Sequence, residues 1–186
     1  TPDSRKTFIY NTFEKLMKAI SKSLKKNDPN HLNLGIRYGY IEQLDDELLR
    51  ISKESFDALS FNCYALSPDH EKMNHALEIS GLPMIIGEYH FGTVDRGLAQ
   101  SLWQVNSQKE RGDAFRYYTE NAFAHRGLIG TGWFRWIDQN INGRTDGENY
   151  NCGFIDVTDR PYPYMVDAAI ETAKSLYEIH SGTKTP

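Results

Sequence analysis

The chain has 186 residues, of which 39% are hydrophobic, 12% aromatic and 25% charged, and its formal net charge is -4. This composition is typical of a globular protein with one apolar core, and the frequent aromatic residues and small net charge exclude intrinsic disorder. The sequence has no run of roughly 18 apolar residues, as a membrane span needs. Its charges of both signs are interspersed, which argues against a nucleic-acid-binding protein.

Helices and short apolar strands are predicted to alternate along the chain. A helix is expected over 5–26, after Asp3 and Ser4, and it is followed by a strand from Leu32 to Tyr38. The remaining elements are, in order, a helix over 44–52, a strand over 56–64, a helix opened by Pro68 and Asp69 and ended by Gly81, a strand over 83–88, a helix over 107–125, a strand over 128–136 and a helix over 162–180. This alternation predicts an α/β fold with a parallel sheet.

Two long segments without a periodic pattern, 89–106 and 137–161, follow the third and fourth strands. Loops longer than about 12–15 residues are usually functional, and parallel α/β folds place their sites at the carboxyl ends of strands. The sequence has neither a GxGxxG nor a P-loop motif, so nothing in it predicts a nucleotide cofactor. We therefore expect the functional site in these two segments.

The third strand ends in a carboxylate, Glu88, beside aromatic residues. Such a group is costly to bury unless it has a chemical role or a charged partner. The alternatives are therefore a functional carboxylate and a structural ion pair with an arginine such as Arg37. The fourth strand ends in Trp133 and Trp136, whose indole faces are suited to stack on sugar rings. Polar side chains that suit sugar hydroxyls stand near the strand ends: Asn62, Tyr64, Asp138 and Gln139.

A Gly-rich polar loop that contains Glu148 runs from Asn142 to Tyr150, and by itself it is also consistent with a solvated turn. Together with the strand-end residues it describes the cleft of a glycosidase. Such a cleft needs paired carboxylates beside the scissile bond, about 5–5.5 Å apart in retaining enzymes. Glu88 supplies one of them.

No metal or other cofactor is expected. The two cysteines, Cys63 and Cys152, lack metal-ligand spacing and are interpreted as small buried side chains, with a disulfide as the alternative if the protein is exported. Asp138, Asp146 and Glu148 lack the regular spacing of a calcium loop.

Four contiguous motifs resemble a known family. Gly87 to Gly97 resembles the strand-seven motif of the family 50 glycoside hydrolases, the β-agarases. The strand-eight region of that family is similar to three further stretches, Trp133 to Gln139, Gly143 to Tyr150 and Gly153 to Tyr162. The resemblance covers roughly residues 30–180.

The resemblance implies the C-terminal half of a TIM (β/α)8 barrel, with parallel strands five to eight and flanking helices. We expect residues 1–186 to be a single partial catalytic barrel domain, because a full barrel needs about 250 residues. The N-terminal half, with the general acid/base of the family, lies outside the chain. The exposed sheet edges of a half barrel predict that the isolated chain dimerises, misassembles or depends on its N-terminal half.

The resemblance also assigns roles to single residues. It implies that Glu88 is the nucleophile and that His90 lines the same pocket or is a structural group. Tyr64 matches a position beside the nucleophile, where a tyrosine often hydrogen-bonds it in the clan of retaining barrel glycosidases. Arg37, on the adjacent strand, is expected from its position and charge to keep Glu88 ionised. The other predicted substrate contacts are Asn62, Tyr64, Trp133, Trp136, Asp138, Gln139 and Glu148. Glu148 is the less favoured alternative for the missing acid/base.

The implied function is retaining hydrolysis of β-galactosidic linkages in a polysaccharide or oligosaccharide, by an O-glycosidase that is inactive as an isolated fragment. The alternatives are a β-galactosidase of a related family, a catalytically silent carbohydrate-binding fragment and, lower, another barrel enzyme acting on a carbohydrate or phosphosugar. A polysaccharide substrate would place the protein in the periplasm or outside the cell, although no targeting signal shows this.

Overall fold

The computed structural model describes residues 2–186. Contacts within the chain divide it into two compact units. Unit 1 contains the residues up to 62 together with 69–85, and unit 2 contains 63–68 and 86–186. The prediction of a single partial barrel domain stays a prediction.

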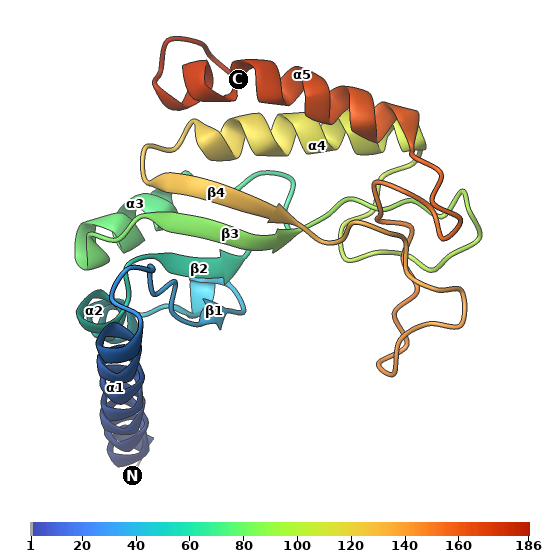
Figure 1. Cartoon of the computed structure of the whole chain (residues 1–186). Helices are drawn as coiled ribbons and strands as arrows, with labels where there is room; N and C mark the ends of the chain where they lie inside the picture. The colour runs from blue at the N-terminus through green and yellow to red at the C-terminus, as the bar shows by residue number, and fades with distance from the viewer. Residues whose placement is uncertain (1) are drawn as a thin grey trace. The chain divides into compact units, whose positions relative to one another are not determined.

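Four strands form one sheet in the order β1 (Arg37–Tyr38), β2 (Leu59–Asn62), β3 (Met84–Tyr89) and β4 (Leu128–Trp133). The strands are parallel: in the β1–β2 register Arg37 lies opposite Ser60, and β3 and β4 point the same way in Figure 1. A helix follows each strand. The α/β fold with four parallel strands and flanking helices is therefore confirmed, and it is compatible with half of a barrel.

Three helices belong to unit 1: α1 (Pro2–Asn27), α2 (Asp46–Ser55) and α3 (His70–Ser80), with a short 3-10 turn, η1 (Ile41–Gln43), before α2. Their ends follow sequence signals. The Asp45 carboxylate accepts the Leu48 amide at the start of α2, and Gly81 ends α3 at a φ of 67°, which glycine adopts without strain. The buried apolar residues of this unit are Met17, Ile41, Leu44, Leu49, Ile51, Phe56, Ala58, Leu59, Phe61, Met73, Ala76, Leu82 and Met84.

The first predicted strand is much shorter than expected. Only Arg37 and Tyr38 pair, whereas the prediction began at Leu32. Gly35 has a φ of 71°, which breaks the extended backbone, and a Cβ there would lie 2.5 Å from the Phe56 ring. The strand therefore begins only after Gly35, because Phe56 packs closely on the backbone of this glycine. Hydrophobic periodicity does not show such a contact.

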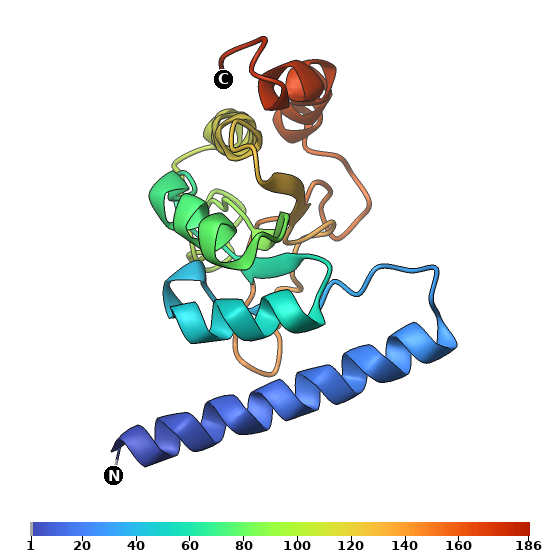
Figure 2. The ribbon, with the colours of Figure 1, turned by 90° about the vertical axis from the view of Figure 1, so that its left-hand side faces the viewer.

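The long helix α1 is confirmed, but its apolar side chains are largely exposed. Phe8 is 70% exposed and Leu16 is 53% exposed, whereas Met17 is 5% exposed. Figure 2 shows α1 as one uninterrupted helix. The apolar spacing thus gives the helix its periodicity without burying most of that face.

Unit 2 contains α4 (Gln108–Phe123) and α5 (Pro163–His180), which lie side by side in Figures 1 and 2. The two helices approach closely at Gly112, where a Cβ would clash with the carbonyl oxygen of Tyr164. The Tyr118 ring of α4 stacks on the Tyr89 ring of β3 with 4.1 Å between centroids, and the Tyr118 hydroxyl donates to the Cys63 carbonyl at 2.7 Å. This packing fixes the end of β3.

Both cysteines are buried, in agreement with the sequence-based interpretation, and neither forms a disulfide in this structure. None of the helices between residues 2 and 186 is at once long enough and apolar enough to cross a membrane.

Candidate active site

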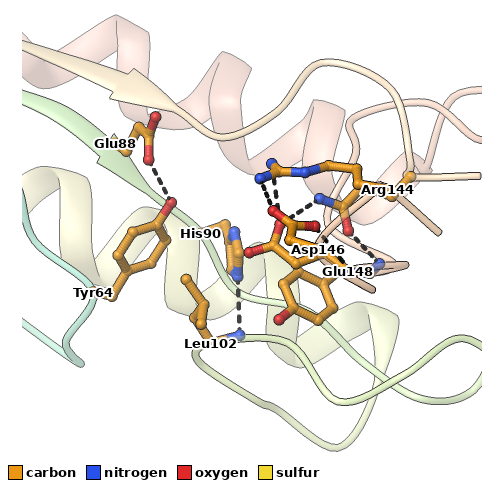
Figure 3. Close-up of polar contacts among 9 residues, drawn as sticks. Tyr64, Glu88, His90, Leu102, Arg144, Asp146 and Glu148 are labelled. Carbon is orange, nitrogen blue, oxygen red and sulfur yellow. Dashed lines mark hydrogen bonds and ion pairs between the residues drawn. The ribbon is translucent and has the colours of Figure 1, made fainter.

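Glu88 is the fifth of the six residues of β3, near the carboxyl end of the strand. Tyr64 comes from the segment after β2, and its hydroxyl donates to Glu88 Oε2 at 2.9 Å (Figure 3). The Cys63 amide donates to the Glu88 carbonyl at 2.9 Å, which fixes the backbone that carries Tyr64. Burial raises the pKa of Tyr64, and the neighbouring Glu88 carboxylate raises it further. Tyr64 is therefore a permanent hydrogen-bond donor to this carboxylate.

His90 follows β3 directly and is 1% exposed. Its Nε2 accepts the Leu102 amide at 3.2 Å, and its ring meets the Tyr64 ring edge-on at 4.9 Å. Burial lowers the pKa of His90 to about 4, and the Arg111 charge acts in the same direction. The ring is therefore neutral near pH 7.

A second charged group comes from the loop after β4. Arg144 pairs closely with Asp146 and also with Glu148, at 3.1 Å between Nη1 and Oε2 (Figure 3). Hydrogen bonding to Asp146 raises the pKa of Arg144 and lowers the pKa of Asp146. The Gln139 side chain donates to the same Glu148 oxygen at 2.8 Å. Since two donors already contact Glu148 Oε2, the geometry suits a charged acceptor better than a proton donor.

The two tryptophans of the β4 end differ in environment. Trp133 donates its indole N–H to the Cys152 carbonyl at 2.7 Å and packs edge-on against Tyr89 at 5.1 Å. Trp136 is 68% exposed and stacks on Phe154, with ring planes 18° apart. Only the latter has the open, supported ring face that a sugar platform requires. The predicted sugar contacts of both tryptophans stay predictions.

Asp138 is 4% exposed, and residues of the segment after β4 hold its carboxylate. This carboxylate accepts from Asn151, from the Tyr162 hydroxyl at 2.6 Å and from the Gly153 amide at 2.7 Å. These bonds account for the buried carboxylate, because a buried charge needs such partners. Its predicted role as a substrate contact stays a prediction.

Sequence reasoning missed a buried cation, Arg111 of α4, which is 0% exposed. Its guanidinium donates to the Phe91 carbonyl at 3.1 Å, to the Gly153 carbonyl at 2.6 Å and to the Gln108 side chain at 2.7 Å. It thereby joins the loop after β3 to the loop after β4. An arginine on a helix face gives no sequence signal of burial, because most such residues are solvated.

Two predicted site residues lie in unit 1: Asn62 at the end of β2 and Arg37 on β1. Their predicted relation to Glu88 stays a prediction. Between residues 2 and 186, no three histidine, cysteine, aspartate or glutamate side chains are grouped so that they could hold a metal ion.

The fold and the site define a parallel α/β protein in which a carboxylate near the carboxyl end of a central strand accepts a hydrogen bond from a tyrosine. No protein-family model matches the chain. It is 36% identical to β-agarase A of Vibrio sp. (strain JT0107), over 85% of this chain and 16% of that protein.

Two solved structures each match 90% of the chain with a TM-score of 0.84. One is an exo-β-agarase, 34% identical over 22% of its length, and the other is a GH50 protein, 36% identical over 24% of its length. The chain is a homologue of part of the family GH50 β-agarases, and it spans about a sixth of the length of the curated relative that it matches.

Proposed function

We propose that this chain supplies the nucleophile-bearing part of a retaining glycoside hydrolase that cleaves β-galactosidic linkages in agarose-type chains. The observation that supports this most directly is the Glu88 carboxylate near the end of β3, with the Tyr64 hydroxyl 2.9 Å away. A carboxylate held in one orientation by a neutral donor is suited to nucleophilic attack. The similarity to β-agarases supports the substrate class.

In the proposed first step, a Glu88 oxygen attacks the anomeric carbon and the bond from that carbon to the leaving-group oxygen breaks. A general acid gives its proton to the leaving oxygen. In the second step, water attacks the same carbon and gives a proton to the same group, now a base, and the Glu88 carboxylate is released. The Tyr64 hydroxyl orients the carboxylate before attack and stabilises its negative charge on release.

The general acid/base is proposed to lie outside this chain. Glu148 is poorly suited to the role, because its Oε2 accepts from Gln139 and from Arg144. Glu148 and Gln139 instead form one polar wall that can receive sugar hydroxyls, and Trp136 offers an exposed ring face.

We infer that activity requires the complementary part of a barrel, and that an isolated chain dimerises or misassembles through its sheet edges. The alternative of a catalytically silent carbohydrate-binding part remains an outcome of the test, as does a β-galactosidase of a related family. A β-agarase-like enzyme should cleave long agarose-type chains, whereas a β-galactosidase should cleave only short galactosides.

The test uses the natural polypeptide that contains this sequence, assayed on agaro-oligosaccharides. Glu88→Gln should lower kcat by about 10⁴-fold or more, as expected for loss of a nucleophile. The matched control Glu78→Gln, at a position on α3, should have no effect. Glu148→Gln should raise KM more than it lowers kcat.

A 2-fluoro galactosyl substrate slows the second step and should leave a covalent sugar on Glu88, which peptide mass spectrometry locates. A label on another carboxylate, or a first-formed product of inverted configuration in NMR, would overturn the assignment. Binding of the oligosaccharide without any hydrolysis would favour the silent binding module.

A further inference from the structure

His90 lies between the segment after β2 and the segment after β4, both of which belong to unit 2. Its ring contacts Tyr64 at 4.9 Å, Tyr150 at 5.7 Å and Phe134 at 5.9 Å between ring centroids. It is 1% exposed, so these aromatic neighbours and the backbone enclose it. A side chain so enclosed is poorly placed to contact a sugar directly.

The Nε2 atom of this ring holds one point of the loop after β3. The Leu102 amide donates to it at 3.2 Å. The base of the same loop is closed by Gly92, which exchanges backbone hydrogen bonds with Trp103 and Val105 at 2.9 Å each. The Leu102 side chain itself is 48% exposed. His90 therefore fixes a segment that presents an open apolar side chain.

The same ring also supports the donor to the nucleophile. The Tyr64 ring packs at a steep angle against the His90 ring, with 4.9 Å between centroids, and the Tyr64 hydroxyl donates to Glu88 Oε2 (Figure 3). Because Nε2 must accept from an amide, the ring is neutral with its proton on Nδ1. One uncharged ring thus touches both the loop and the tyrosine.

We propose that His90 is a positioning residue that couples the loop at Leu102 to the Tyr64–Glu88 pair, so that one wall of the cleft and the nucleophile are held in a common geometry. The two functions use different interactions of the ring: Nε2 accepts the hydrogen bond that holds the loop, and the ring as a whole packs against Tyr64. The part of this inference that concerns turnover rests on the proposed function, and the part that concerns the loop does not.

Two substitutions separate these functions. His90→Phe keeps a ring against Tyr64 but leaves the Leu102 amide without its acceptor. His90→Gln keeps an acceptor near the Nε2 position but removes the ring. The exposed residue His31 provides the control His31→Gln.

The rate of amide hydrogen exchange in the natural polypeptide measures how firmly the loop is held, and the measurement does not depend on enzymatic activity. Exchange at Leu102 should be about 5- to 10-fold faster in His90→Phe, as expected for the loss of one hydrogen bond, and unchanged within about twofold in His90→Gln. On agaro-oligosaccharides, His90→Phe should raise KM about 5-fold with little change in kcat, and His90→Gln should lower kcat about 5-fold with little change in KM.

Unchanged exchange at Leu102 in His90→Phe overturns the proposal. An equal fall in kcat together with an equal rise in KM in both variants also overturns it, because that result indicates only a general packing role. If Glu88→Gln stays active, the proposed function fails, while the exchange result still decides whether His90 holds the loop. Should one variant not fold, the other supplies its own exchange and kinetic test.

Discussion

Tyr64→Phe removes only the hydroxyl that donates to Glu88 Oε2 at 2.9 Å, and it leaves the ring in place against His90. A hydrogen bond to a charged group contributes about 1.5–3 kcal/mol. If that contribution is realised in the transition state, kcat/KM should fall about 10- to 150-fold, since each 1.4 kcal/mol is about tenfold in rate.

The pH dependence of kcat/KM provides a second, independent test of the role of the Tyr64 hydroxyl. Burial and the Glu88 carboxylate raise the pKa of Tyr64 above its usual value of 10, so the phenol stays protonated at every pH at which a glycosidase is normally assayed. The wild-type profile of kcat/KM should therefore show no ionisation of the Tyr64 phenol between about pH 5 and pH 8.

The assay is initial-rate hydrolysis of agaro-oligosaccharides by the natural polypeptide, with Tyr117→Phe as the control. Tyr117 is 50% exposed on α4, so its variant should match the wild type. A loss below about threefold, or an equal loss in the control, would refute the role assigned to the Tyr64 hydroxyl.

Two further predictions concern stability. The pKa of His90 is lowered from 6.5 to about 4, so between these pH values the unfolded chain binds a proton at this position and the folded chain does not. The free energy of unfolding should therefore fall as pH drops below about 6.5, by up to about 1.4 kcal/mol per pH unit. It should level off below about pH 4. Urea titrations should show this slope in the wild type and a weaker one in His90→Gln, and equal slopes would contradict it. Arg111→Met leaves the Phe91 and Gly153 carbonyls without their donor and should lower the free energy of unfolding by about 3 kcal/mol or more. In the same denaturation experiment the exposed substitution Arg50→Met should change it by less than about 0.5 kcal/mol, and a similarly small change for Arg111→Met would show that the buried cation is not needed to join the two loops.

Local sequence patterns determined most of the secondary structure. Helix periodicity, the capping residue Asp69 and the terminating Gly81 depend on neighbours within one or two turns, so α3 begins and ends where the sequence predicts. The continuous apolar run before Glu88 likewise predicted a strand with a carboxylate near its end, and β3 confirms it, although Met84 and Ile86 are buried and Ile85 between them is only partly so. The motifs around Glu88 and Trp133 also predicted the similarity to GH50 β-agarases.

Other contacts were decided only by the tertiary structure. The family resemblance placed Tyr64 beside Glu88, but the Leu102–His90 hydrogen bond joins residues 12 positions apart, and Arg111 joins two loops from inside a helix. Likewise, the apolar spacing of α1 does not show that Leu16 stays 53% exposed. Periodicity records which side chains share a face of one element, whereas burial and pairing depend on what packs against that face, and those neighbours come from distant parts of the chain.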